Sequence, residues 1–364
     1  MTPERSTRPS SPLVQLTGVS GAQETPLPGP TLNPGASTKA ATKRTPVRLR
    51  PGDLVRVRPL QEVFRTLGPD GTLEGVPLMP EMWPFFGHTF RILQHVVQAC
   101  VDGAYLKVHN ESYVREFRNN NVFTLVGVRC SGSQHDGCQR GCTIFWKEAW
   151  LQKVDEASAE TPLDRPSTAD VNKFLHSTLK TRSEDGRFYC QSTEFLKATL
   201  HLSFSRRLWK CVQSVAVGNV GAAAMLRRIT LWMWWKTRHK LFGEHVKGLH
   251  GNTPTECLNL QPGELVEVNS LAEIVATLNE KGRNRGLHFS GDQRPFCGRR
   301  YRVRSRADNF IAEGTGEMKH FRNTVILEDV LCDSSYFAFG GCCRHDFLYW
   351  REAWLRRVED FNSE

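Results

Sequence analysis

The segment PGDLVRV at residues 51–57 returns later in the chain as PGELVEV at residues 262–268. The segments around these two copies align without a gap at a constant offset of 211 residues. A second pair of blocks, FWKEAWLQKV at 145–154 and YWREAWLRRV at 349–358, follows in the same order. Self-similarity of this kind indicates an internal duplication. We therefore predict two related modules, at residues 49–156 and 261–360.

Each module is dominated by short runs that are typical of strands. Residues 88–93 and 300–304 alternate apolar and basic side chains with period two, as expected of a strand with one buried face. Apolar runs at 121–128 and 323–330 lead directly to Cys130 and Cys332. The fold class we expect is α+β, with two small SH3-like β-barrel modules related by internal duplication and joined by a helical connector.

The connector is predicted at residues 157–260. Ser167 and Asp170 have capping-box spacing ahead of an apolar helical face, and further helices are expected at 191–202 and 222–241. The last one mixes tryptophans with basic residues, a pattern that suits core packing with a solvated basic face. Contact with a membrane surface or with nucleic acid is the alternative.

The N-terminal segment, residues 1–48, is rich in Pro, Ser, Thr and Gly and has no apolar periodicity. A segment of this composition cannot bury enough apolar surface to fold. We predict a disordered basic tail.

The stretch RCSGSQHDGCQRGC at 129–142 concentrates four potential metal ligands, Cys130, His135, Cys138 and Cys142. Zinc prefers tetrahedral sulfur and nitrogen coordination, and the intervening glycines allow the loop to fold back on itself. The sequence predicts a zinc site here, with buried or redox-active thiols as the alternative. Cys100 is a possible further ligand. Glu148 and Glu352 are each expected to pair with a neighbouring cation, Lys147 or Arg351, or with a backbone amide rather than act as a general base.

The second copy has a different arrangement, in which Cys297, Cys332, Cys342 and either Cys343 or His345 are the candidate zinc ligands. Three other cysteines have no companions nearby in the sequence, and we expect them to be buried apolar residues. They are Cys190, Cys211 and Cys257.

Composition limits the classes of function. The 364 residues carry a net charge of +10, and the longest apolar run, at 231–235, is far below the roughly 20 residues that span a bilayer. No secretory signal is visible, so we expect a cytoplasmic protein with reduced cysteines. Phosphate-binding loops, the GxSxG elbow and the zinc-deaminase pattern are absent from the sequence.

The blocks PGDLVRV, MPEMWPFFG, VRCSGSQHDGCQRGC, FWKEAWL and LNLQPGELVEV resemble a bacterial family of tandem-repeat proteins without an assigned activity. The resemblance spans roughly residues 50–358 and implies the same domain plan and candidate ligands. The family usually has Tyr-Cys-Gly after the MPEM block, where this chain has Phe85-Phe86-Gly87. In the second copy Phe337 follows Tyr336, where the family often has a histidine.

These features together predict a non-catalytic, zinc-stabilised binding or adaptor protein whose partner is a protein. One alternative is a metal-dependent biosynthetic enzyme with its site at the module interface. The other is a nucleic-acid-binding protein, for which the basic charge would supply the attraction.

Overall fold

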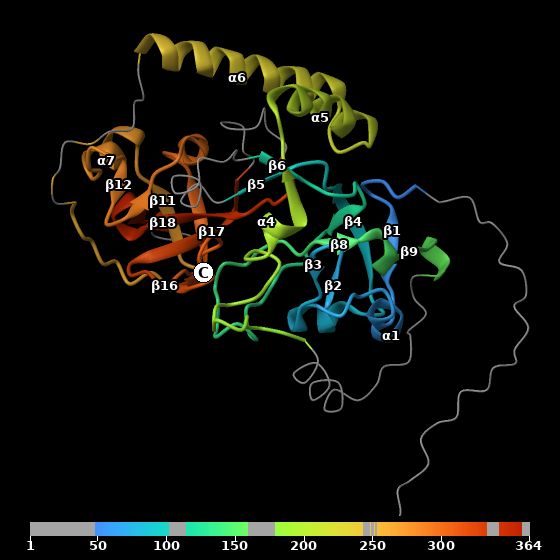
Figure 1. The fold of residues 1–364 in the computed structure, drawn as a ribbon. Helices are drawn as coiled ribbons and strands as arrows, with labels where there is room; N and C mark the ends of the chain where they lie inside the picture. The colour runs from blue at the N-terminus through green and yellow to red at the C-terminus, as the bar shows by residue number, and fades with distance from the viewer. Residues whose placement is uncertain are drawn as a thin grey trace, which may run out of the picture. The chain divides into compact units, whose positions relative to one another are not determined.

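The computed structural model describes residues 48–101, 114–158, 179–242, 248, 251, 253–332 and 342–358. These residues form a mixed α+β structure of several small antiparallel sheets and few helices (Figure 1). The expected α+β class is therefore confirmed. The predicted basic tail lies outside the described residues except for Arg48, and so does the capping box at Ser167 and Asp170.

A five-stranded antiparallel sheet organises the first module, with the order β8-β7-β4-β1-β9. Val55 and Val57 alternate with more exposed neighbours along β1 and are fully buried, as the period of two predicts. Helix α1 (Leu60–Phe64) follows β1, and a 3₁₀ turn, η2 (Glu148–Trp150), lies between the last two strands. The strands are β1 (Leu54–Val57), β4 (Thr89–His95), β7 (Val122–Leu125), β8 (Trp146–Lys147) and β9 (Leu151–Lys153).

The second module has a five-stranded sheet with the corresponding order, β18-β17-β14-β11-β19. Helix α7 (Leu271–Ala276) follows β11 and begins at Ser270, whose side chain accepts a hydrogen bond from the amide of Glu273. The 3₁₀ turn η5 (Glu352–Trp354) again separates the last two strands. The strands are β11 (Leu265–Val268), β14 (Arg300–Arg306), β17 (Thr324–Leu331), β18 (Phe347–Arg351) and β19 (Leu355–Arg357).

Paired tryptophans close both modules. Trp146 and Trp150 are fully buried in the core of the first, and Trp350 and Trp354 in that of the second. The indole nitrogen of Trp150 donates to Thr66 Oγ1 at 2.9 Å, and Trp354 makes the same contact with Thr277 at 2.9 Å. Each pair sits on a strand and the following 3₁₀ turn, which together form a hydrophobic corner.

The two modules also contain smaller elements, among them three two-stranded sheets. They are β2 (Thr72–Leu73), β3 (Val76–Pro77), η1 (Pro80–Phe85), η3 (Glu156–Ser158), β12 (Arg283–Asn284), β13 (Leu287–His288), η4 (Gly291–Phe296), β15 (Asn309–Ile311) and β16 (Met318–His320).

The connector is only partly helical in the described residues. The helix expected at 191–202 is wrong: a short helix, α4 (Phe195–Ala198), is followed by strand β10 (Thr199–His201). Pairing overrides helix propensity here, because β10 joins a three-stranded sheet in the order β10-β6-β5, with β6 (Val114–Phe117) and β5 (Ala99–Cys100).

Two longer helices complete the connector. Helix α5 (Phe204–Ala216) was not predicted from the sequence, whereas α6 (Ala222–Phe242) agrees with the expected helix at 222–241. The two helices contact each other (Figure 1).

Candidate site at the cysteine loop

The cysteine loop, which we define as residues 129–143, runs between β7 and β8 and folds back on itself. The amide of Cys130 donates to the carbonyl of Cys142 at 2.8 Å, and Arg129 and Thr143 form an isolated antiparallel bridge. At Gly132, φ is +68° and a Cβ atom would lie 1.9 Å from the carbonyl oxygen of Cys138. Only glycine fits such a close backbone approach, so this residue makes the return of the loop possible.

The four predicted ligands of this loop line one cavity of about 30 Å³. Cys130, His135, Cys138 and Cys142 are joined there by Cys190 of the connector. Met79, Phe145 and Ile311 supply apolar walls. Sequence reasoning treated Cys190 as a thiol without companions. Only the tertiary fold brings it to the loop, and no local sequence signal identifies it.

His135 is held on both sides by acceptors. Its Nδ1 atom makes a short contact with Glu81 Oε1, and its Nε2 atom lies 3.0 Å from the carbonyl oxygen of Tyr189. With Glu81 ionised, both nitrogens carry hydrogen to satisfy both acceptors, which is the imidazolium form of the ring. Burial by itself would lower the pKa of His135, but the hydrogen bond and negative charge of Glu81 raise it above the ordinary value. In this state the ring offers no lone pair to a metal or to a substrate proton.

Burial makes three of the thiols around the cavity harder to ionise. Burial raises the pKa of Cys142 to about 12, and it raises that of Cys130 further still. Burial also raises the pKa of Cys190. A thiol whose pKa is raised in apolar surroundings is a poor nucleophile. Arg140 and Arg344 line the same cavity and act to lower the pKa of Cys142, but the effect of burial is larger.

The cysteine loop packs directly on the second module. The amide of Ile311 in β15 donates to Cys138 Sγ at 3.4 Å, and Gln139 Oε1 accepts from the amide of Asp308 at 2.6 Å. The Arg129 guanidinium donates to the carbonyl of His345 at 2.8 Å. The connector therefore joins two modules that are also in direct contact through the cysteine loop.

A buried ion network reinforces this junction. Glu313 has no exposed side-chain surface and accepts from Arg140 at 3.1 Å and from Arg344 at 2.8 Å. Arg344 also contacts Asp346 at 3.1 Å and donates to the carbonyl of Cys100 in β5 at 3.0 Å. The network joins the cysteine loop, the second module and the small sheet of the first module. Removing one of its carboxylates would leave a buried charge uncompensated.

The candidate ligands of the second copy are distributed over different parts of the fold. Cys297 packs against the core of the second module, whereas Cys342 and Cys343 belong to the core of the first. Cys342 Sγ accepts from the amide of Cys100 at 3.2 Å, and Cys332 Sγ lies 3.7 Å from Asp292 Oδ2. Across the part of the chain that the structure describes, no group of three or more His, Cys, Asp or Glu side chains is placed to hold a metal ion.

The three cysteines expected to be buried without companions have different surroundings. Cys211 is buried beside Met225, as expected of an apolar residue. Cys257 is exposed, so the expectation for it is wrong. Cys190 is buried, but it faces the thiol cavity.

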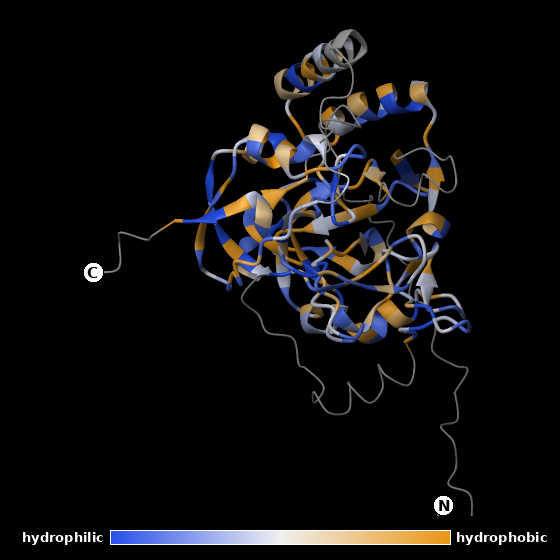
Figure 2. Cartoon of the chain, turned by 90° about the vertical axis from the view of Figure 1, so that its left-hand side faces the viewer, coloured by the Kyte–Doolittle hydropathy of each residue, from blue (hydrophilic) through white to orange (hydrophobic). Residues whose placement is uncertain are grey.

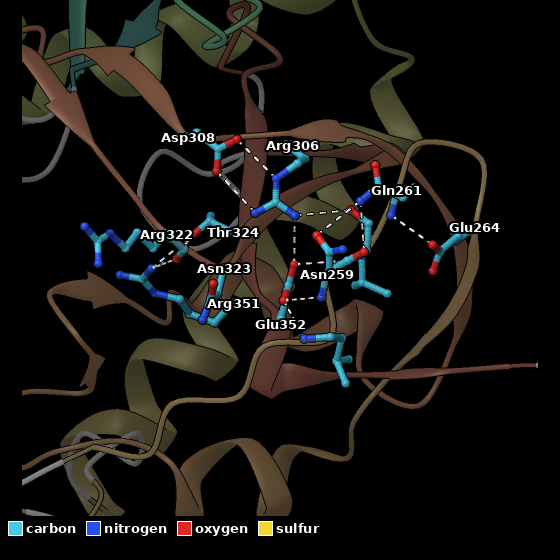
Figure 3. A network of polar contacts seen from close by, with 12 residues as sticks. Asn259, Gln261, Glu264, Arg306, Asp308, Arg322, Asn323, Thr324, Arg351 and Glu352 are labelled. Atoms are coloured by element: carbon cyan, nitrogen blue, oxygen red, sulfur yellow. Dashed lines mark hydrogen bonds and ion pairs between the residues drawn. The ribbon is translucent and has the colours of Figure 1, made fainter.

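Glu352 of the FWKEAWL-like corner has a structural role (Figure 3). Its fully buried carboxylate accepts from the amides of Leu258, Asn259 and Leu260 at 2.6, 3.0 and 3.2 Å and from Arg306 at 3.1 Å. These contacts fix the end of the connector to the second module, as the expected pairing with backbone amides implies. Its counterpart Glu148 is half-buried, and the neighbouring Lys147 pairs with Glu74 and Asn121 instead.

None of the helices described here has the length and apolarity needed to cross a membrane. Searches against protein-family models, curated proteins and solved structures find no match to this chain.

Proposed function

We propose that this chain is a non-catalytic binding protein in which the cysteine loop acts as a structural junction. The observation that carries the proposal is the state of the groups around the cavity. Its histidine has both nitrogens engaged by acceptors, and burial raises the pKa of Cys130 and Cys142. This combination favours a locking role over catalysis, which requires an available base or an activated nucleophile.

We further propose that the cavity takes a zinc ion through Cys130, Cys138, Cys142 and Cys190, with His135 outside the ligand set. The support is chemical, because four thiols line one small cavity that has apolar walls. Arg140 and Arg344 also line this cavity, and their charge favours the thiolate form of Cys142. Zinc accepts four sulfur ligands in structural sites. To bind zinc, the thiols would have to rotate toward a common point and lose their protons. The affinity for zinc would therefore decrease as the pH decreases.

The two modules are proposed to be SH3-like barrels that arose by duplication, as in the tandem-repeat family that the sequence resembles. In support, their sheets have corresponding strand orders, each with a 3₁₀ turn before the last strand. The Trp150–Thr66 and Trp354–Thr277 hydrogen bonds also occupy aligned positions.

A protein partner is the proposed ligand. An open cavity of about 580 Å³ lies beside the cysteine loop and is lined by side chains of both charges, among them Asp136, Arg187, Glu317 and His320. Such a surface suits a polar segment of a partner. The alternative function, that of a metal-dependent biosynthetic enzyme, is supported only by the location of the thiol cavity at the junction of the two modules.

Metal analysis of the purified full-length chain tests the proposal. We expect about one zinc per chain, lost in Cys190→Ser together with a lower melting temperature, and retained in the matched control Cys211→Ser. A wild-type protein without a transition metal, and with the same melting temperature as Cys190→Ser, would remove zinc from the proposal. A measured enzymatic turnover abolished by Cys142→Ser would instead remove the non-catalytic role.

A further inference from the structure

Helix α5 is attached to the rest of the chain by polar contacts. Lys210 is buried and pairs with Glu116 of β6 at 2.8 Å, and Arg206 contacts the same carboxylate at 2.5 Å. After the helix, Asn219 makes two hydrogen bonds with the backbone of His95. Its Nδ2 donates to the His95 carbonyl at 2.7 Å, and its Oδ1 accepts from the His95 amide at 2.9 Å. The inward side of α5 is therefore largely polar.

The outward side of α5 is apolar. Leu208, Trp209 and Val212 are 44%, 66% and 56% exposed, and their spacing places them on one side of the helix. Helix α6 adds Leu226, at 64% exposed, and Met233, at 49%. Of the eleven large apolar side chains that the described residues expose, eight lie on these two helices.

The exposed apolar side chains are additional to those that join the two helices. Cys211 packs against Met225 between the helices, with Ile229 and Trp232 beside them. Figure 2 shows apolar residues interspersed along both helices. Single exposed apolar residues occur on most protein surfaces, whereas a concentration of them marks an interaction surface.

The charge of the same segment has one sign. Residues 203–242 contain eight Lys and Arg residues and no Asp or Glu. Two of the eight pair with Glu116 of β6, and the segment itself has no acidic residue to balance the remaining six. A basic helix with exposed tryptophan and leucine fits an anionic lipid surface, where tryptophan favours the headgroup region and basic residues attract acidic headgroups.

We propose that the α5–α6 hairpin docks on the surface of an anionic phospholipid bilayer. The apolar side chains of α5 insert among the headgroups, and the basic residues approach the lipid phosphates. Nucleic acid fits less well, because single-strand binding uses aromatic stacking and leaves the aliphatic Leu208, Val212 and Leu226 without a role. A second copy of the chain also fits less well, because two surfaces with the same positive charge repel each other. This inference is independent of the thiol cavity.

Vesicle co-sedimentation of the full-length chain tests the proposal. One set of vesicles contains phosphatidylcholine alone, and the other contains equal parts of phosphatidylcholine and phosphatidylglycerol. The variants are Trp209→Ala, which removes an inserted side chain, and Arg227→Glu, which reverses a charge. Val126→Ser is the matched control, because Val126 is 51% exposed but lies outside the hairpin. Circular dichroism verifies that each variant is folded.

We expect binding to the anionic vesicles only, weakened at least about tenfold by Trp209→Ala, weakened by Arg227→Glu and unchanged by Val126→Ser. High salt should reduce the binding. Equal sedimentation of folded Trp209→Ala and wild type would overturn the proposal, as would failure to bind anionic vesicles. Two further results would also overturn it. One is tighter binding to single-stranded RNA than to vesicles. The other is a wild-type dimer that Trp209→Ala dissociates.

Discussion

Replacing Glu81 by glutamine tests how the cysteine loop is locked. The side chains of Glu81 and His135 are 0% and 2% exposed, and Glu81 also accepts from the amide of Gln134 at 3.1 Å. Removing one partner of a buried ion pair costs about 3–5 kcal/mol when the other charge remains. His135 can escape part of this cost by losing its proton, since the ordinary pKa of histidine is about 6.5. The neutral ring then satisfies only one of its two acceptors.

The loss of unfolding free energy expected in Glu81→Gln therefore depends on pH. Near neutral pH, one unsatisfied buried acceptor costs about 1–3 kcal/mol. The pKa of His135 is raised in the folded wild type, so the stability from the pair is fully present below the unfolded pKa and is lost as pH rises through the folded value. The loss of unfolding free energy in Glu81→Gln should therefore increase as pH falls from about 7.5 toward about 5.5.

Urea unfolding followed by tryptophan fluorescence at several pH values measures this difference. Glu62→Gln is the matched control, because Glu62 pairs with Arg58 on the surface, with side chains 48% and 36% exposed. Such an i,i+4 pair contributes about 0.5 kcal/mol or less. A Glu81→Gln loss that stays constant or shrinks as pH falls would refute the protonated state assigned to His135.

Three further predictions concern the fold. Gly132→Ala should prevent the native loop from closing, because its Cβ would overlap the Cys138 carbonyl, and limited proteolysis should cut the variant in this loop. Thr277→Val leaves the buried Trp354 indole without its acceptor and should lower the unfolding free energy by about 1–3 kcal/mol; an unchanged denaturation midpoint would contradict this. Burial lowers the pKa of His95 in the folded protein, so as the pH falls the unfolded chain takes up this proton before the folded chain does. Wild type should therefore lose unfolding free energy relative to His95→Gln between about pH 7 and about pH 5. A pH dependence of the opposite sign would show that His95 is charged in the folded state.

Periodicity and repetition in the sequence predicted the parts of the fold that local chemistry controls. The strand expected at 300–304 is β14, and that at 323–330 is β17. Helix α6 was also predicted close to its observed bounds. In these segments the spacing of apolar residues agrees with the final environment, so local pattern and tertiary structure give the same answer.

Long-range contacts account for what sequence reasoning missed. Residues 199–201 form β10 because β6 offers a pairing edge, which no local pattern shows. Helix α5 is the exception, because Leu208, Trp209 and Val212 lie on one side of the helix and this local pattern could have identified it. Cys190 joins the cysteine loop only through folding of the connector.

The ligand set is the part of the account that a single measurement tests most directly. Zinc-edge X-ray absorption of the purified full-length chain reports which atoms surround the ion. We predict a sphere of sulfur atoms alone at about 2.3 Å, with one sulfur signal lost in Cys190→Ser. A nitrogen ligand at about 2.0–2.1 Å would place His135 on the metal and contradict its clamping by Glu81, and a protein without zinc would contradict the metal junction altogether.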